Sequence, residues 1–205
     1  MQKSFEKILK GYKAFRQKYA QGYSSIMQEL SESGQRPEIM FVSCCDSRVD
    51  PALILQCDPG DLFIVRNVAS IVPPFEKDQS YHGTSAALEF GIRFLNVKHL
   101  IILGHSQCGG MQALLNDDFS SENDFITKWV SIVKKSDNSF QNVEAAVKSS
   151  LQQSYENCLT FPWIKEKVEN KTLKLHLWFF DIKTGQIFTQ INGQNEWGRI
   201  PDITA

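Results

Sequence analysis

Four short apolar runs, separated by segments with helical periodicity, limit most strongly what this chain can fold into. The runs cover 39–42, 62–65, 100–103 and 173–181. Continuous apolar runs of this length are typical of strands buried on both faces of a parallel sheet. Helical patterns occupy 84–95, 108–116, 122–135, 139–157 and 161–169, and a turn leads into a hairpin strand at 186–190. The sequence therefore predicts an α/β fold: a mostly parallel central sheet of four strands plus an antiparallel edge strand, flanked by helices.

Residues 1–33 form a separate N-terminal helical arm in this prediction, ahead of an α/β domain at 34–205. Apolar residues recur in the arm at steps of three or four and form one stripe, and Gly22 divides the arm. The stripe consists of Phe5, Ile8, Leu9, Tyr12, Phe15 and Tyr19. Two interpretations stay open, because the stripe can pack on its own domain or pack against a second subunit.

Composition points to a protein that acts on a small molecule. The 205 residues are 42% apolar with a net charge of −1, and no basic block suggests a nucleic-acid partner. No apolar stretch approaches the roughly 20 residues that span a bilayer, and the first residues do not resemble a signal peptide. Five cysteines without a regular framework favour reduced thiols and a cytoplasmic location.

Potential metal ligands follow two of the predicted strands. Cys44 ends the first run, and His105 and Cys108 follow the third. Ligands in open α/β sheets bind at the carboxyl ends of the strands, so these residues meet if the strands are neighbours. Catalytic zinc takes three protein ligands and keeps a fourth position open. Gly109 and Gly110, at the start of a helix, leave backbone N–H groups that favour thiolate and anionic ligands.

An acid and an arginine accompany the first cysteine. Asp46 and Arg48 lie two residues apart and can face the same cleft. The guanidinium would keep Asp46 ionised as a hydrogen-bond acceptor. Such an acceptor would orient a water molecule whose pKa zinc lowers from about 15.7 towards 7. The alternative is an ordinary ion pair at the end of a helix.

Together these fragments resemble the β-carbonic anhydrases. Cys44-Cys45-Asp46-Ser47-Arg48 is followed about sixty residues later by Gly-His-Ser-Gln-Cys-Gly-Gly, and the resemblance is specific over 34–115. It implies reversible hydration of carbon dioxide to bicarbonate and a proton by zinc-bound hydroxide, with zinc as the cofactor. It also implies that Cys44 rather than Cys45 binds the metal, and that the chain forms a homodimer or homotetramer with active sites between subunits.

Finer features resemble the plant-type branch of the family. Phe41 replaces the tryptophan of an inhibitory bicarbonate site, whereas Arg66 of that site is present, with an alternative role in a structural ion pair. The resemblance implies that Gln35 donates a hydrogen bond to bound bicarbonate. It further implies a substrate pocket that comprises Gln35, Phe63, Val68, Phe90 and Gly109.

The route by which a proton would leave departs from the plant pattern. Plant members carry tyrosine and histidine, both implicated in proton movement, where this chain has Phe90 and Phe94. Neither phenyl ring can carry a proton. His82 is the nearest candidate to do so, whereas His99 and His176 fall in predicted strands and favour a structural role.

Two other functions compete with carbon dioxide hydration. A related enzyme on the same scaffold would hydrolyse carbon disulfide or carbonyl sulfide, and access to the pocket would decide between the substrates. A non-catalytic protein stabilised by zinc would instead have a closed, four-ligand site and no acid–arginine pair. The presence of Asp46 and Arg48 argues against the latter.

Overall fold

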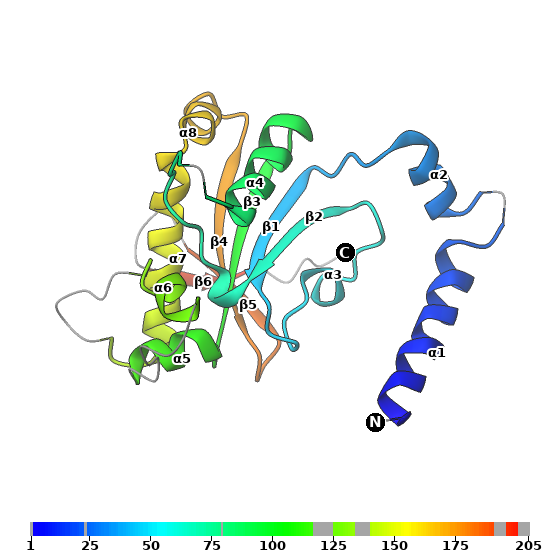
Figure 1. Cartoon of the computed structure of the whole chain (residues 1–205), viewed down its shortest axis with the longest axis horizontal. Coiled ribbons are helices and arrows are strands. Elements are labelled where there is room, and N and C mark those ends of the chain that lie inside the picture. Colours follow the sequence, from blue (N-terminus) through cyan, green and yellow to red (C-terminus); the bar gives the residue numbers. More distant parts are fainter. Residues whose placement is uncertain are drawn as a thin grey trace.

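A computed structural model describes residues 2–22, 24–78, 80–116, 125–133, 140–190 and 196–200. Its six-stranded sheet has the order β2-β1-β3-β4-β5-β6 (Figure 1). The strands are β1 (Ile39–Cys44), β2 (Leu62–Asn67), β3 (His99–His105), β4 (Lys174–Asp181), β5 (Gln186–Gln190) and β6 (Trp197–Arg199). The first four are parallel, and β5 and β6 run antiparallel. The predicted sheet is confirmed, and β6 is one further strand, too short for a sequence pattern to reveal.

Helices cover both faces of the sheet unequally. They are α3 (Pro51–Ile54), α4 (Gly83–Glu89), α5 (Gly109–Leu115), α6 (Ile126–Val130), α7 (Val143–Thr160) and α8 (Pro162–Glu169). Helices α4 to α8 pack on one face, and the single turn of α3 lies on the other (Figure 1). No helix among the described residues is long and apolar enough to cross a membrane.

Two helical predictions need correction at their ends. The helix expected over 84–95 is α-helical only to Glu89, and a π-helical turn, η2 (Phe90–Phe94), follows it. Of the helix expected over 122–135, the described residues 125–133 contain α6, and the rest lies outside them. Periodicity cannot separate an α from a π turn, because both place apolar side chains on one face.

Alternation along β1 decides which way the site residues point. Met40, Val42 and Cys44 are buried among the helices α4 to α8, and Phe41 is buried on the face that α3 partly covers. Successive side chains of a strand point to opposite faces, so Cys44 lies on the helix-covered side. The neighbours Cys44 and Cys45 differ accordingly, because Cys44 is buried and Cys45 is exposed.

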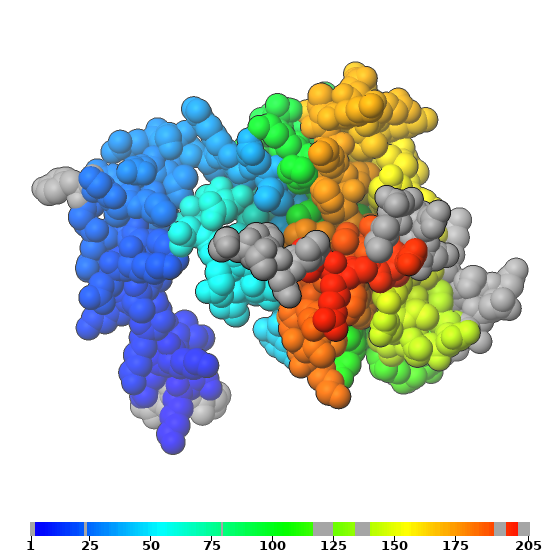
Figure 2. Space-filling view, turned by 180° about the vertical axis from the view of Figure 1, so that it is seen from behind, coloured from blue at the N-terminus to red at the C-terminus, as the bar shows by residue number. Residues whose placement is uncertain are grey.

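The N-terminal arm consists of two helices, α1 (Gln2–Tyr19) and α2 (Ile26–Ser33). The predicted break is confirmed, and Gly22 has a φ of +98°, which favours glycine. Most of α1 stands away from the body of the molecule (Figures 1 and 2). Phe5 and Ile8 are 64% and 67% exposed. Within this chain, the first turns of the apolar stripe therefore do not pack on their own domain.

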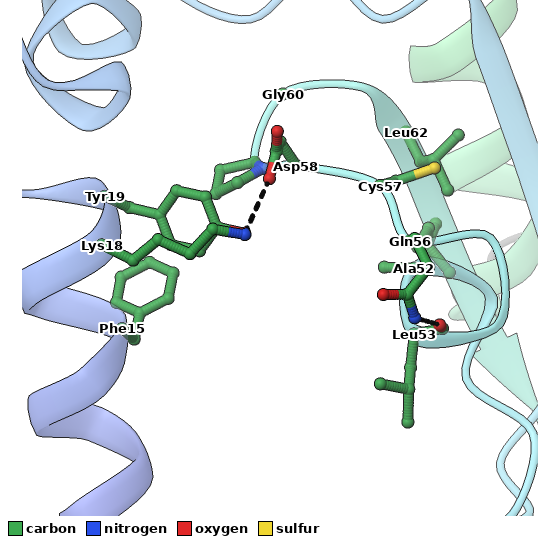
Figure 3. Close-up of a pocket in the computed structure, with 12 residues that line it drawn as sticks. Phe15, Lys18, Tyr19, Ala52, Leu53, Gln56, Cys57, Asp58, Gly60 and Leu62 are labelled. Carbon is green, nitrogen blue, oxygen red and sulfur yellow. Dashed lines mark hydrogen bonds and ion pairs between the residues drawn. The ribbon is translucent and has the colours of Figure 1, made fainter.

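Within the described residues, the base of α1 is the part that reaches the rest of the domain. Phe15, Lys18 and Tyr19 face α3 and the loop that follows it across a pocket of about 460 Å³ (Figure 3). The Tyr19 hydroxyl donates a hydrogen bond of 2.6 Å to Asp58 Oδ1, and Lys18 lies 3.5 Å from the same oxygen. The arm is thus fixed at one end and offers an apolar face along the remainder.

Candidate metal centre and active site

Three potential metal ligands converge at the carboxyl ends of β1 and β3. The ligand atoms of Cys44, His105 and Cys108 all lie within 4.8 Å of one another, and all three residues are buried. Strands β1 and β3 are paired directly, which brings the two sequence fragments together as predicted. Separations of this size suit a zinc ion bonded to sulfur at about 2.3 Å and to nitrogen at about 2.0 Å.

The His105 ring is held in the orientation that a metal ligand needs. Its Nδ1 donates a hydrogen bond of 2.8 Å to the carbonyl oxygen of Ser106, which leaves the lone pair on Nε2. Nε2 is buried and has no hydrogen-bond partner among the described residues. A buried polar atom without a partner is costly, and a metal at this position would satisfy it.

The two cysteines are close enough to share a proton. The hydrogen bond that the Cys108 thiol donates lowers the pKa of the Cys44 thiol well below its ordinary value, because it stabilises the thiolate. The same hydrogen bond, followed by burial, raises the pKa of Cys108. A thiolate is the form that binds a metal ion, so the donor set fits zinc.

Asp46 and Arg48 form a bidentate ion pair beside these ligands. Arg48 Nε donates to Asp46 Oδ1 at 3.0 Å, and Nη2 donates to Oδ2 at 2.7 Å. The hydrogen bond from Arg48 is the main reason that the pKa of Asp46 lies well below its ordinary value. Asp46 Oδ2 is 4.0 Å from His105 Nε2, so an ionised carboxylate borders the space between the ligand atoms.

Arg48 also joins the two sequence fragments, through a residue that the sequence analysis did not identify. Its Nη2 donates to the carbonyl oxygen of Gln107 at 3.2 Å, and Nη1 donates to Gln107 Oε1 at 3.4 Å. Gln107 lies between the two ligands of the second fragment and has a φ of +55°. A residue other than glycine seldom adopts this conformation, and this signal appears only in the structure.

Arg66 fixes the backbone that carries Cys44 and Asp46. Its guanidinium donates to the carbonyl oxygens of Cys44, Asp46 and Val49 at 2.8–3.0 Å and to Asp50 Oδ2 at 3.0 Å. These contacts are the ones expected if Arg66 forms a structural ion pair, which is the alternative role given for it in the sequence analysis. Phe41 is fully buried and packs edge-on against Trp178.

Replacing Arg66 with glutamine is expected to destabilise the fold by about 1–3 kcal/mol, because three backbone carbonyls lose a charged donor. Urea unfolding of the zinc-loaded protein measures this change. Arg93→Gln is a matched control, since Arg93 forms an exposed ion pair with Glu89 at 2.7 Å, worth about 0.5 kcal/mol or less. An equal decrease in the free energy of unfolding in the two variants would show that the contacts of Arg66 with the backbone do not stabilise the fold.

A short turn after β2, η1 (Val68–Ser70), forms one wall of the site. Ala69 and Ser70 have φ values of +66° and +58°, and Asn67 holds the turn through two hydrogen bonds with the backbone of Ile71. A Cβ on Gly110 would lie 2.9 Å from Val68 Cγ1, so only glycine lets α5 approach this closely. At Gly109 a Cβ would meet nothing within 4 Å.

The residues predicted for the substrate pocket fall into two groups. Val68 and Gly109 adjoin the potential ligands, since Val68 follows Asn67, the partner of Cys44, and Gly109 follows Cys108.

The second group lies further from the ligands. Phe63 is paired with Met40, four residues before Cys44 and thus about 13 Å along the strand. Phe90 packs against Phe63 in a tilted arrangement, with ring centroids 5.8 Å apart. Gln35 precedes β1 and lies at this same amino-terminal end of the sheet.

The buried Cys₂His set at the carboxyl edge of a parallel sheet is a donor set that fits zinc in a protein of the α/β class, and comparison with known proteins indicates the family. A family model described as carbonic anhydrase matches residues 39–187. Beta carbonic anhydrase 5, chloroplastic, of Arabidopsis thaliana is 40% identical over 153 residues, 69% of this chain and 50% of that protein. The match thus spans half the length of this relative.

Solved structures agree with the family model. The β-carbonic anhydrase CcaA has a TM-score of 0.85 at 28% identity, over 96% of this chain and 100% of that chain. One of two tetrameric β-carbonic anhydrases from Sordaria macrospora has a TM-score of 0.72 at 28% identity, over 91% and 93%. This chain belongs to the carbonic anhydrase family, within its β class, whose members use zinc.

Proposed function

We propose that this protein catalyses the reversible hydration of carbon dioxide to bicarbonate and a proton. The observation that carries the proposal is the ionised Asp46, held by Arg48, next to three converging ligand atoms. Zinc bound to Cys44, His105 and Cys108 would lower the pKa of a water molecule from about 15.7 towards 7. A closed structural site would need a fourth protein ligand, and no such ligand belongs to the cluster in the described residues.

Asp46 orients the reacting water in this proposal. Two of its hydrogen bonds to Arg48 fix the carboxylate in one plane, and a third comes from the Arg48 backbone N–H at 2.9 Å. An ionised carboxylate only accepts hydrogen bonds. It therefore takes a hydrogen bond from the water and directs an oxygen lone pair of that water towards carbon dioxide.

The substrate side of the site combines an apolar wall with open space. Val68 supplies the wall, and the space beside Gly109 leaves room for a small molecule. Carbon dioxide is apolar, so such a wall favours it. A stopped-flow assay of carbon dioxide hydration, run beside carbon disulfide turnover, tests the proposal. Turnover of carbon disulfide alone would favour the related hydrolase.

We also propose that the chain is a dimer, or a tetramer of two dimers, in which each copy completes the pocket of the other. Phe63 lies about 13 Å along the sheet from Cys44 of its own chain, and its neighbour Phe90 and the residue Gln35 lie towards the same amino-terminal end. Phe90 is 44% exposed, and Phe5 and Ile8, in the first turns of α1, are 64% and 67% exposed. A second copy supplies these side chains, and an isologous pair forms two equivalent sites.

Mixing two inactive variants tests this shared site. One variant is Asp46→Asn, and the other combines Gln35→Ala, Phe63→Ala and Phe90→Ala. When the two are unfolded and refolded together, about half of the dimers hold one chain of each kind, and each of these has one intact site. We expect about a quarter of the wild-type activity to return.

The pattern of recovery separates shared from self-contained sites. If every pocket residue acted within its own chain, each site of the mixed dimer would carry a defect, and no activity would return. Sedimentation velocity on the same samples controls for failed assembly. A wild-type monomer at working concentration would contradict the dimer outright.

Two finer assignments belong to the same proposal. Gln35, Phe41 and the 40% identity with the chloroplastic relative support the plant-type branch. We also propose a reducing compartment, the cytoplasm, supported by the five free thiols, two of them in the metal centre. Cell fractionation tests the location.

A further inference from the structure

Hydration of carbon dioxide releases one proton per turnover, and some group must carry it from the site to solvent. Asp46 is poorly placed to carry it, because both of its carboxylate oxygens already accept hydrogen bonds from Arg48. Near the site, a cavity of about 1320 Å³ extends from Cys45, Asn67 and Val68 to the start of α4. Val68, which supplies the apolar wall of the proposed active site, is therefore also part of the lining of this cavity.

Few of the cavity's side chains suit proton transfer near neutral pH. Its ionisable groups, among the residues that the structure describes, are Cys45, Glu76, Asp78, Tyr81, His82, Lys128 and Glu156. Histidine is the side chain type whose ordinary pKa lies between 5 and 8. The chain has four histidines. His105 is a metal ligand, and His99 and His176 contact each other at 3.0 Å towards the opposite end of the sheet.

His82 is held in the cavity by a carboxylate. Its Nε2 lies 2.6 Å from Asp78 Oδ1, and the same oxygen accepts the backbone N–H of Ser80 at 2.8 Å. The hydrogen bond with His82 is the main reason that the pKa of Asp78 falls to about 2. Because a carboxylate only accepts, the neutral ring carries its proton on Nε2 and keeps a lone pair on Nδ1.

A contact made by the nearby Thr84 places the start of α4 next to the strand ends. Two residues after His82, Thr84 Oγ1 accepts a hydrogen bond of 3.2 Å from Asn67 Nδ2. Asn67 is the strand partner of Cys44, and its carbonyl oxygen accepts the backbone N–H of Cys45. The helix α4 therefore begins beside the strand ends that carry the site.

From this arrangement, and resting on the proposed function, we propose that His82, oriented by Asp78, accepts the proton released by hydration and passes it to solvent. The proton reaches Nδ1 through water in the cavity, the ring becomes imidazolium, and a buffer base then removes the proton. In the reverse direction the same steps deliver a proton to the site. His82 thereby takes the role that Phe90 and Phe94 cannot perform.

Stopped-flow hydration at low buffer concentration tests this role. In His82→Gln we expect kcat to fall about 10-fold, with kcat/KM unchanged, because the carbon–oxygen bond forms before the proton leaves. Added imidazole should restore kcat. Asp78→Asn should lower kcat by a smaller factor, and His99→Gln, at the other end of the sheet, is the matched control.

Nitrogen-15 NMR gives a readout that does not depend on turnover. In alkaline solution the wild-type His82 ring should carry its proton on Nε2, and Asp78→Asn should lose this preference. Wild-type kcat in His82→Gln at low buffer, or a ring protonated on Nδ1, would overturn the proposal. Absence of hydration in the wild-type protein would instead overturn the proposed function, and the NMR result would still report the His82–Asp78 pair.

Discussion

Replacing Cys44 with serine is expected to remove zinc from the protein. The Cys44 sulfur is one of three ligand atoms within 4.8 Å, and the other two cannot hold the ion with comparable strength. Zinc affinity should fall by more than about 100-fold, beyond the 10–100-fold loss typical of residues that only support a ligand. Competition with a chromophoric chelator measures the affinity.

Cys45→Ser is the matched control for this prediction. Cys45 is the adjacent cysteine, and its side chain is exposed while that of Cys44 is buried. The control should keep about one zinc per chain and full affinity. If Cys45→Ser lost zinc and Cys44→Ser kept it, the assignment of the ligand would be reversed.

Replacing Asp46 with asparagine is expected to abolish most hydration while zinc remains bound. The amide keeps the size of the carboxylate but loses its charge, and one of its ends becomes a donor. The bidentate ion pair with Arg48, in which both carboxylate oxygens accept hydrogen bonds, cannot form. Misplacing a reacting group by about 1 Å can cost about 100-fold in rate, so we expect kcat/KM to fall by at least about 100-fold when the water is no longer oriented.

A second acidic residue controls for loss of charge alone. Glu144 pairs with Lys148 at 2.6 Å on α7, and Glu144→Gln should leave both zinc content and hydration unchanged. Metal analysis of each variant separates the loss of activity from the loss of metal. Wild-type hydration in Asp46→Asn would require a different group to orient the water.

The convergence of the three potential metal ligands was predictable from the topology of the sheet. Once 39–42 and 100–103 are read as neighbouring parallel strands, their carboxyl ends meet, and Cys44, His105 and Cys108 meet with them. The contact between Asp46 and Arg48 is equally local, since two residues separate them. These parts of the site depend only on strand order and short spacing.

Contacts that depend on register and turn conformation were beyond the sequence. Arg66 reaches the backbone of Cys44 because β2 pairs with β1 in one particular register. The hydrogen bond from Arg48 to Gln107 accompanies a positive φ at Gln107. The amino-acid type does not predict this backbone conformation, because residues other than glycine seldom adopt it. The distance of Phe63 from Cys44 likewise follows from register, and so the sequence placed in one pocket residues that a single chain keeps apart.

The most direct test of the account is a zinc titration of the metal-free full chain with carbon dioxide hydration measured on the same preparation. The account predicts that activity rises in proportion to bound zinc and stops rising at one ion per chain. Stoichiometric binding of zinc without hydration, or hydration that does not depend on zinc, would contradict it.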